Sequence, residues 1–158
     1  MVEKAKHDLE RLADEMNKTA FIGIRDENKV VYVYKYQPET VRIKTCEIGK
    51  RNDLYNTSLG KSLLAYTDKE TQQKIIEQIE FVKTAMNTIT NKDDFLEELK
   101  QTKERGYSID FRENEDHMVC LGAPIFDYTG NVIAAISLSD LYDETQNIEV
   151  DGLKVRET

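Results

Sequence analysis

The sequence has few of the residues that build catalytic and metal centres. Its 158 residues include two histidines, His7 and His117, and two cysteines, Cys46 and Cys120. Neither histidine stands at a recognisable spacing from a nucleophile or from a metal partner. The cysteines have no CxxC spacing, which favours free thiols in a reducing cytoplasm. We therefore expect a protein that is not an enzyme, with no catalytic residue, no metal ion and no cofactor.

Long hydrophobic stretches are also missing. Nowhere do about 18 consecutive apolar residues occur, which excludes a membrane-spanning helix. Residues 1–6 are largely charged and precede no apolar run, so we expect no signal peptide. The sequence thus predicts a cytoplasmic protein.

Basic side chains also do not outnumber acidic ones. The chain carries 22 basic and 30 acidic side chains, which gives a net charge of −8. Binding to nucleic-acid phosphates depends on clusters of lysine and arginine, and no basic run stands out. The anionic leaflet of a membrane repels an acidic surface. We therefore expect neither direct binding of DNA or RNA nor binding to a membrane.

The length and the absence of repeats or linkers indicate one domain over residues 1–158. Apolar periods of about 3.6 and about 2 residues distinguish the expected helices from the expected strands. Helices are expected over residues 2–17, 57–66, 67–78 and 92–105, and from about residue 144. Strands are expected over residues 20–24, 30–36, 41–46, 107–112, 118–126 and 132–139, with a loop over residues 47–57. Strand-rich flanks around a helical middle predict an α+β fold, in which helices flank a mostly antiparallel central sheet.

A glycine-containing helix start at residues 60–62 (GKS) has two functional interpretations. A nucleotide-binding P-loop is disfavoured, because it needs a further glycine where Tyr55 stands. The backbone N–H groups of Ser58, Leu59 and Gly60 at a helix N-terminus can instead hold a carboxylate. On local sequence alone, an ordinary capped helix start remains the simpler interpretation.

Four side chains on the expected strands of the last third are further candidates, and each has an ordinary interpretation. Asp110 is typical of a solvated strand edge, and Cys120 of a small buried core residue. Ser137 and Ser139 alternate along a strand and share one face, where they either fill space or line a pocket. An enzyme that uses Cys120 as nucleophile is a weaker alternative, because His117 lies three residues away and points to the opposite face.

Three segments of the chain follow the order of one known family. Residues 54–65 (LYNTSLGKSLLA) are similar to the family segment plhaTalGKalLA. Residues 87–110 contain TIT, LEEL and RGYSID, similar to the family run T-x-T-i, L-x-x-eL and r-x-x-Gya-x-D. Residues 113–139 are similar to E…ciAaPvfd…vvaAlsvSg. Together the segments resemble the effector-binding domain of IclR-type transcriptional regulators, over roughly residues 5–155.

The resemblance implies a GAF-like sensor domain that controls a helix-turn-helix DNA reader. That reader precedes the effector domain in the family, so we expect it to be absent here. The resemblance also implies that the chain stops within the final helix of the family pattern. The family further implies a homodimer or homotetramer that contacts DNA only through the missing N-terminal domain. The expected ligand-binding residues are Ser58, Leu59, Gly60, Asp110, Cys120, Ser137 and Ser139.

The expected effector is a small carboxylate metabolite, of 2-oxo or sugar-acid type. Its carboxylate would accept hydrogen bonds from the backbone of Ser58 and Leu59 and from the hydroxyls of Ser137 and Ser139. An ionised Asp110 would instead accept from a ligand hydroxyl or a hydrated carbonyl. The alternative is a dimerisation module without a ligand, in which the two serines affect only stability.

Overall fold

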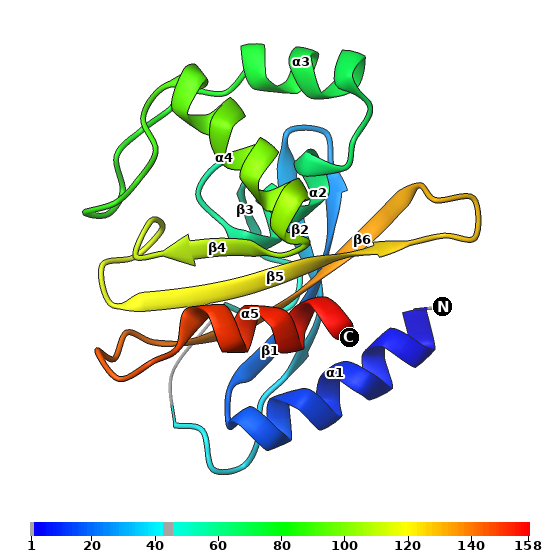
Figure 1. Cartoon of the computed structure of the whole chain (residues 1–158), viewed down its shortest axis with the longest axis vertical. Helices are drawn as coiled ribbons and strands as arrows, with labels where there is room; N and C mark the ends of the chain where they lie inside the picture. The colour runs from blue at the N-terminus through cyan, green and yellow to red at the C-terminus, as the bar shows by residue number, and fades with distance from the viewer. Residues whose placement is uncertain (1, 43–45) are drawn as a thin grey trace.

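An antiparallel sheet of six strands runs through the part of the chain that the computed structural model describes, residues 2–42 and 46–158 (Figure 1). Neighbouring strands lie in the order β3-β2-β1-β6-β5-β4. Their bounds are β1 Thr19–Asp26, β2 Lys29–Tyr36, β3 Arg51–Asp53, β4 Ser108–Phe111, β5 Met118–Phe126 and β6 Val132–Leu141. The hairpin β1–β2 and the hairpin β5–β6 join where β1 pairs with β6, which unites both ends of the chain in one sheet.

Helices cover both faces of this sheet. Their bounds are α1 Val2–Met16, α2 Ser58–Ala65, α3 Lys69–Glu77, α4 Lys92–Arg105 and α5 Ile148–Glu157. Figure 1 shows α2, α3 and α4 grouped together, away from α1 and α5. Successive residues of β1 point to opposite faces, so Phe21 packs in the core under α2 and α4, whereas Ala20 and Ile22 pack in the core under α1 and α5.

Local capping interactions set the ends of the helices around the middle of the chain. The side chain of Thr57 accepts a hydrogen bond from the Gly60 N–H at 3.1 Å and begins α2. Asn91 begins α4 in the same way, by accepting from the Asp94 N–H at 2.9 Å. Gly106 ends α4 in the left-handed conformation, with φ of +85°, as the sequence predicts.

Helix α2 lies directly on the sheet, and all eight of its residues are buried. Two glycines permit this approach. A Cβ on Gly60 would lie 2.3 Å from the carbonyl oxygen of Leu54, and a Cβ on Gly122 of β5 would lie 3.0 Å from the carbonyl oxygen of Ser58. The Ser108 hydroxyl of β4 donates to the same Ser58 carbonyl at 2.6 Å, which fastens the first turn of α2 to the sheet.

Helix α1 connects to the sheet through a very short link. Asn17 and Lys18 alone separate its last residue from the start of β1, and the Lys18 N–H donates to the Ala13 carbonyl at 3.1 Å. Thr19, the first residue of β1, pairs with Ser139 of β6. The end of α1 therefore lies next to a strand that carries two of the predicted ligand-binding residues.

The α+β class and the antiparallel sheet are confirmed, but one predicted strand is wrong. Of the strand expected over residues 41–46, the described residues 41, 42 and 46 lie outside any strand, and residues 43–45 lie outside the described residues. A strand forms instead at β3, within the expected loop over residues 47–57, and pairs with β2. Its three residues are polar and carry no apolar alternation, so backbone pairing alone reveals this strand.

The C-terminal helix starts later than predicted. It begins at Ile148 instead of near residue 144, because Asn147 is its N-cap and accepts from the Val150 N–H at 3.1 Å. Residues 144 and 145 form a turn before it.

The cap at Thr57 gives a prediction about stability. Its hydroxyl accepts from Gly60 and also donates to the Asp53 carbonyl at 2.7 Å, so it ties α2 to β3. Thr57→Ala is expected to lower the free energy of unfolding by about 1–2 kcal/mol, measured by chemical denaturation. Thr57→Ser keeps the hydroxyl and should lose less than half as much. Equal losses in the two variants would show that the methyl group, not the cap, stabilises this corner.

Candidate functional site

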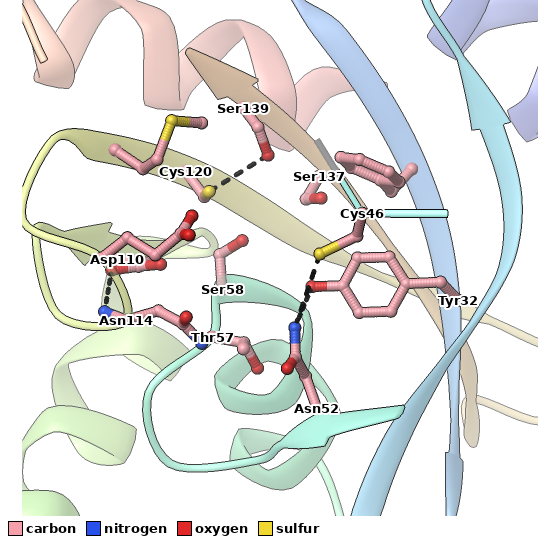
Figure 2. Close-up of a pocket in the computed structure, with 13 residues that line it drawn as sticks. Tyr32, Cys46, Asn52, Thr57, Ser58, Asp110, Asn114, Cys120, Ser137 and Ser139 are labelled. Carbon is pink, nitrogen blue, oxygen red and sulfur yellow. Dashed lines mark hydrogen bonds between the residues drawn. The ribbon is translucent and has the colours of Figure 1, made fainter. Parts of the chain in front are cut away.

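A cavity of about 50 Å³ lies between the start of α2 and the face of the sheet that α2 covers (Figure 2). Five of the seven residues predicted from the sequence line it, namely Ser58, Asp110, Cys120, Ser137 and Ser139. The other lining residues are Phe21, Tyr32, Cys46, Asn52, Thr57, Asn114, Glu115 and Met118. The structure thus gathers residues that are more than 80 positions apart in the sequence around one small space.

The register of the last three strands brings the predicted side chains together. Asp110 of β4 pairs with Cys120 of β5, and Cys120 pairs with Ser139 of β6. Directly opposed residues of antiparallel strands project to the same face, so these three side chains form a row across the sheet. The Cys120 thiol and the Ser139 hydroxyl are hydrogen-bonded at 3.1 Å, and Ser137 lies two residues along on the same face (Figure 2).

The first turn of α2 supplies backbone donors above this row. The Gly60 N–H is already bonded to Thr57, so it is not available to a ligand. The N–H groups of Ser58 and Leu59 precede the first intrahelical bond, which runs from the Lys61 N–H to the Thr57 carbonyl at 3.1 Å. Of the three predicted backbone donors, the N–H groups of Ser58 and Leu59 therefore remain available to a ligand.

Leu59 and Gly60 do not line the cavity with their side chains. The Leu59 side chain is buried and packs toward β1, where its Cδ1 would lie 2.9 Å from a Cβ placed on Gly23. Gly60 faces the backbone of Leu54 instead. Both residues serve the packing of α2, and a direct contact of Leu59 with a ligand can involve only its backbone.

Asp110 is buried at one end of the cavity. Its Oδ1 accepts hydrogen bonds from the backbone N–H of Glu113 at 2.9 Å and of Asn114 at 3.3 Å. Burial raises the pKa of Asp110 to about 7, and the negative charge of Glu113 contributes to the rise. The two backbone donors oppose this shift but do not cancel it, so the carboxyl group of Asp110 titrates near neutral pH.

A buried ion pair lies behind Asp110. The Lys61 side chain of α2 is fully buried, and its Nζ lies 2.5 Å from Glu113 Oε1, 2.7 Å from the Ile109 carbonyl and 3.5 Å from Glu98 Oε1. Burial raises the pKa of Glu113, and the contact with Lys61 lowers it in part. The second Glu113 oxygen accepts from the Phe111 N–H at 3.0 Å, so this pair fixes the turn that follows β4.

Eight lining residues were not predicted, and hydrogen bonds connect three of them, Tyr32, Cys46 and Asn52. The Asn52 amide donates to the Tyr32 hydroxyl at 3.2 Å and to the Cys46 sulfur at 3.7 Å (Figure 2). A regular strand would place Tyr32 on the same face as Tyr34, but a register shift of β2 opposite residues 22 and 23 of β1 places it under α2. No pattern in the sequence marks this irregularity.

The cavity is poorly suited to catalysis by Cys120. Burial raises the pKa of the Cys120 thiol well above its ordinary value, and Asp110 adds to the rise, so the reactive thiolate is disfavoured. His117 is exposed on the approach to β5.

Within residues 2–42 and 46–158, no three histidine, cysteine, aspartate or glutamate side chains gather in a way that could hold a metal ion. The helices of the same ranges include none with the length and apolar character needed to cross a membrane.

The sheet, its flanking helices and the polar cavity define an α+β domain of GAF-like architecture. The sequence matches the family described as bacterial transcriptional regulator IclR C-terminal over residues 1–152. The chain belongs to this family, and it is therefore an effector-binding domain of a transcriptional regulator.

Known relatives and solved structures agree with this assignment. The HTH-type transcriptional regulator KdgR of Escherichia coli K12 is 37% identical over 132 residues, which are 84% of this chain and 49% of that protein. The chain thus spans about half the length of the curated relatives it matches. The crystal structure of Thermotoga maritima IclR superposes with a TM-score of 0.90 at 28% identity, over 98% of this chain and 64% of that one.

A ligand-bound structure is among the similar structures. It is a double mutant of the inducer-binding domain of the PobR transcription factor from Acinetobacter, in complex with 3-hydroxybenzoic acid. Its TM-score is 0.86 at 26% identity, over 99% of this chain and 94% of that one.

The pKa of Asp110 predicts how stability depends on pH. Unfolding returns the carboxyl to an ordinary pKa of about 3.9, so between about pH 4 and pH 7 the folded state binds more protons than the unfolded state. The contribution of Asp110 to the free energy of unfolding is therefore present below this window and is lost as pH rises through it. The free energy of unfolding of the wild type minus that of Asp110→Asn, measured by denaturation, should fall from pH 5 to pH 7 and stay constant above about pH 8.

Asp127 provides a control, because its pKa is shifted in the direction opposite to that of Asp110. Its pKa is lowered, chiefly because the Thr129 hydroxyl donates to it, so its contribution is lost only in acid. The difference between wild type and Asp127→Asn should be constant from pH 5 to pH 8. A constant difference for Asp110→Asn as well would contradict the raised pKa.

Proposed function

We propose that this domain senses a small carboxylate metabolite, of 2-oxo or sugar-acid type, on behalf of a cytoplasmic IclR-type regulator, and that the metabolite binds in the cavity under α2. The observation that carries the proposal is the row of Asp110, Cys120 and Ser139 facing the free N–H groups at the start of α2. A carboxylate is the group that N–H and O–H donors in a partly dry cleft bind well.

Donors and acceptors are arranged so that a ligand with two polar ends fits. The backbone N–H groups of Ser58 and Leu59 and the hydroxyls of Ser137 and Ser139 can donate to a carboxylate. At the sides, the Tyr32 hydroxyl already accepts from Asn52, so its own proton remains to be donated to a ligand oxygen. The 3-hydroxybenzoic acid bound by the PobR domain also combines a carboxyl group with a second polar group.

The size of the cavity favours a short acid. A volume of about 50 Å³ is far below the roughly 300–1,000 Å³ of pockets that hold drug-sized ligands. A two- or three-carbon acid suits this volume, whereas an aromatic acid requires the cavity to widen. Apolar contacts come from Phe21 and Met118, which line the cavity beside the polar groups.

The two serine hydroxyls test the site directly. Isothermal titration of the protein with pyruvate, lactate and glycerate should show binding of at least one acid. Ser137→Ala and Ser139→Ala should each weaken it by about tenfold or more, because a hydrogen bond to a charged group contributes about 1.5–3 kcal/mol. Thr102→Ala is the matched control, since it removes a buried hydroxyl from α4, away from the cavity.

The outcomes separate the sensor from the alternative of a dimerisation module without a ligand. Loss of affinity in the serine variants and not in Thr102→Ala supports the sensor. The absence of heat with every acid, while circular dichroism shows a folded protein, would contradict it.

We also propose that the effector acts by shifting the association state of the regulator. A ligand that binds one arrangement of subunits more tightly than another shifts the population between them, and this changes the spacing of the DNA-reading domains. In sedimentation velocity experiments, saturating effector should change the fraction of dimer or tetramer formed by this domain. An identical distribution with and without bound effector would contradict this coupling and leave ligand binding unaffected.

A further inference from the structure

The proposed carboxylate site lacks a free positive charge among the described residues. Two acidic residues, Asp110 and Glu115, line the cavity, and none of the lining residues within 2–42 and 46–158 is a lysine or an arginine. Sites that bind carboxylates commonly offer a guanidinium or an ammonium group, which balances the charge of the ligand. Here the donors are neutral, so another source must balance the charge.

The buried cation nearest to the start of α2 is already paired. Lys61 contacts Glu113 at 2.5 Å, Glu98 at 3.5 Å and the Ile109 carbonyl at 2.7 Å, and its side chain is fully buried. Its three N–H donors thus have three acceptors, two of which carry negative charge. Lys61 balances these carboxylates and is not among the residues that line the cavity.

The groups that face Asp110 come from several elements and are mostly acidic or neutral. Glu113 and Glu115 follow it in the turn after β4, Cys120 lies opposite on β5, and Lys61 lies behind it on α2. Tyr32 of β2 and Cys46 line the other side of the cavity. Asp110 lines the same small cavity as the proposed carboxylate donors, so a bound ligand brings a second negative charge near it, and two carboxylates that share a buried site cannot both remain ionised at low cost.

We propose that the carboxylate ligand binds together with one proton, which Asp110 holds on Oδ2 and donates to the ligand. This inference rests on the proposed carboxylate site and specifies its chemistry. The ligand enters as an anion, solvent supplies the proton, and the complex contains a carboxylic acid–carboxylate pair with one negative charge. Asp110 Oδ1 keeps its two backbone hydrogen bonds, so the turn after β4 does not have to move.

The fold itself favours this protonation, because burial raises the pKa of Asp110 to about 7. A bound anion raises it further. Above neutral pH, binding should therefore take up close to one proton, and the dissociation constant should rise about tenfold for each pH unit. Below about pH 6, Asp110 carries its proton before the ligand arrives, so uptake should approach zero.

The experiment is isothermal titration of the whole protein with sodium pyruvate, sodium lactate and sodium 3-hydroxybenzoate, in phosphate and in Tris buffer for the alkaline measurement and in MES and in Bis-Tris buffer for the acidic one. The difference in observed heat between buffers of different ionisation enthalpy gives the number of protons taken up. About one proton per ligand is expected at pH 8, and almost none at pH 5.5. Asp127→Asn, an aspartate variant outside the cavity, should give the same numbers as wild type.

Asp110→Asn identifies the group that holds the proton. Its amide oxygen can keep both backbone hydrogen bonds and its NH₂ can donate to the ligand, so this variant should bind without proton uptake and with an affinity independent of pH. Wild-type binding at pH 8 without uptake would overturn the inference and leave the proposed function standing. Uptake that persists in Asp110→Asn would overturn the assignment to Asp110. Failure of every acid to bind the folded wild type would overturn the function and the inference together.

Discussion

The contact of α2 with the sheet is the constraint on which the cavity depends. Gly122 has no side chain, so the Ser58 carbonyl can approach β5, and the Ser108 hydroxyl holds it there at 2.6 Å. Gly60 allows the same helix to pass close to the backbone of Leu54. A shift of α2 outward by the width of one methyl group would move its free N–H groups away from Ser137 and Ser139, and the cavity would lose its donors.

The same helix also fixes the opposite end of the cavity. Lys61 is one residue beyond Gly60, and its pairing with Glu113 anchors the turn in which Asp110 accepts two backbone hydrogen bonds. Helix α2 thus positions the N–H donors directly. It also positions Asp110, at the acidic end of the cavity, through the buried ion pair of Lys61 and Glu113. Breaking such a pair from one side leaves a buried charge without a partner, which costs far more than an exposed pair contributes.

Much of the fold follows from the sequence, and the exceptions have physical reasons. The helix from Lys92 to Arg105 and the strand from Met118 to Phe126 have the predicted bounds, because caps, Gly106 and apolar alternation all agree there. The short strand β3 was missed because its pairing depends on the neighbouring backbone, not on its own side chains.

Five of the seven predicted residues lie together at the cavity, and the others do not line it, for similar reasons. Asp110, Cys120 and Ser139 share a face, which alternation can suggest, but only the register of three strands shows that they are neighbours. Tyr32 was missed because an irregularity in β2 reverses the face on which it lies. Gly60 was assigned to the ligand because a helix start does not reveal which of its N–H groups its own cap already uses.

The short link between α1 and β1 has a mechanical consequence. Thr19 pairs with Ser139, and only two residues separate Thr19 from α1, so the helix behaves as a lever whose pivot lies beside the cavity wall. Its 15 residues make an arm about 22 Å long, at 1.5 Å per residue. A tilt of about 5° at the pivot would displace the far end by about 2 Å, and it would also shift Leu9 and Leu12, which pack in the core under α1.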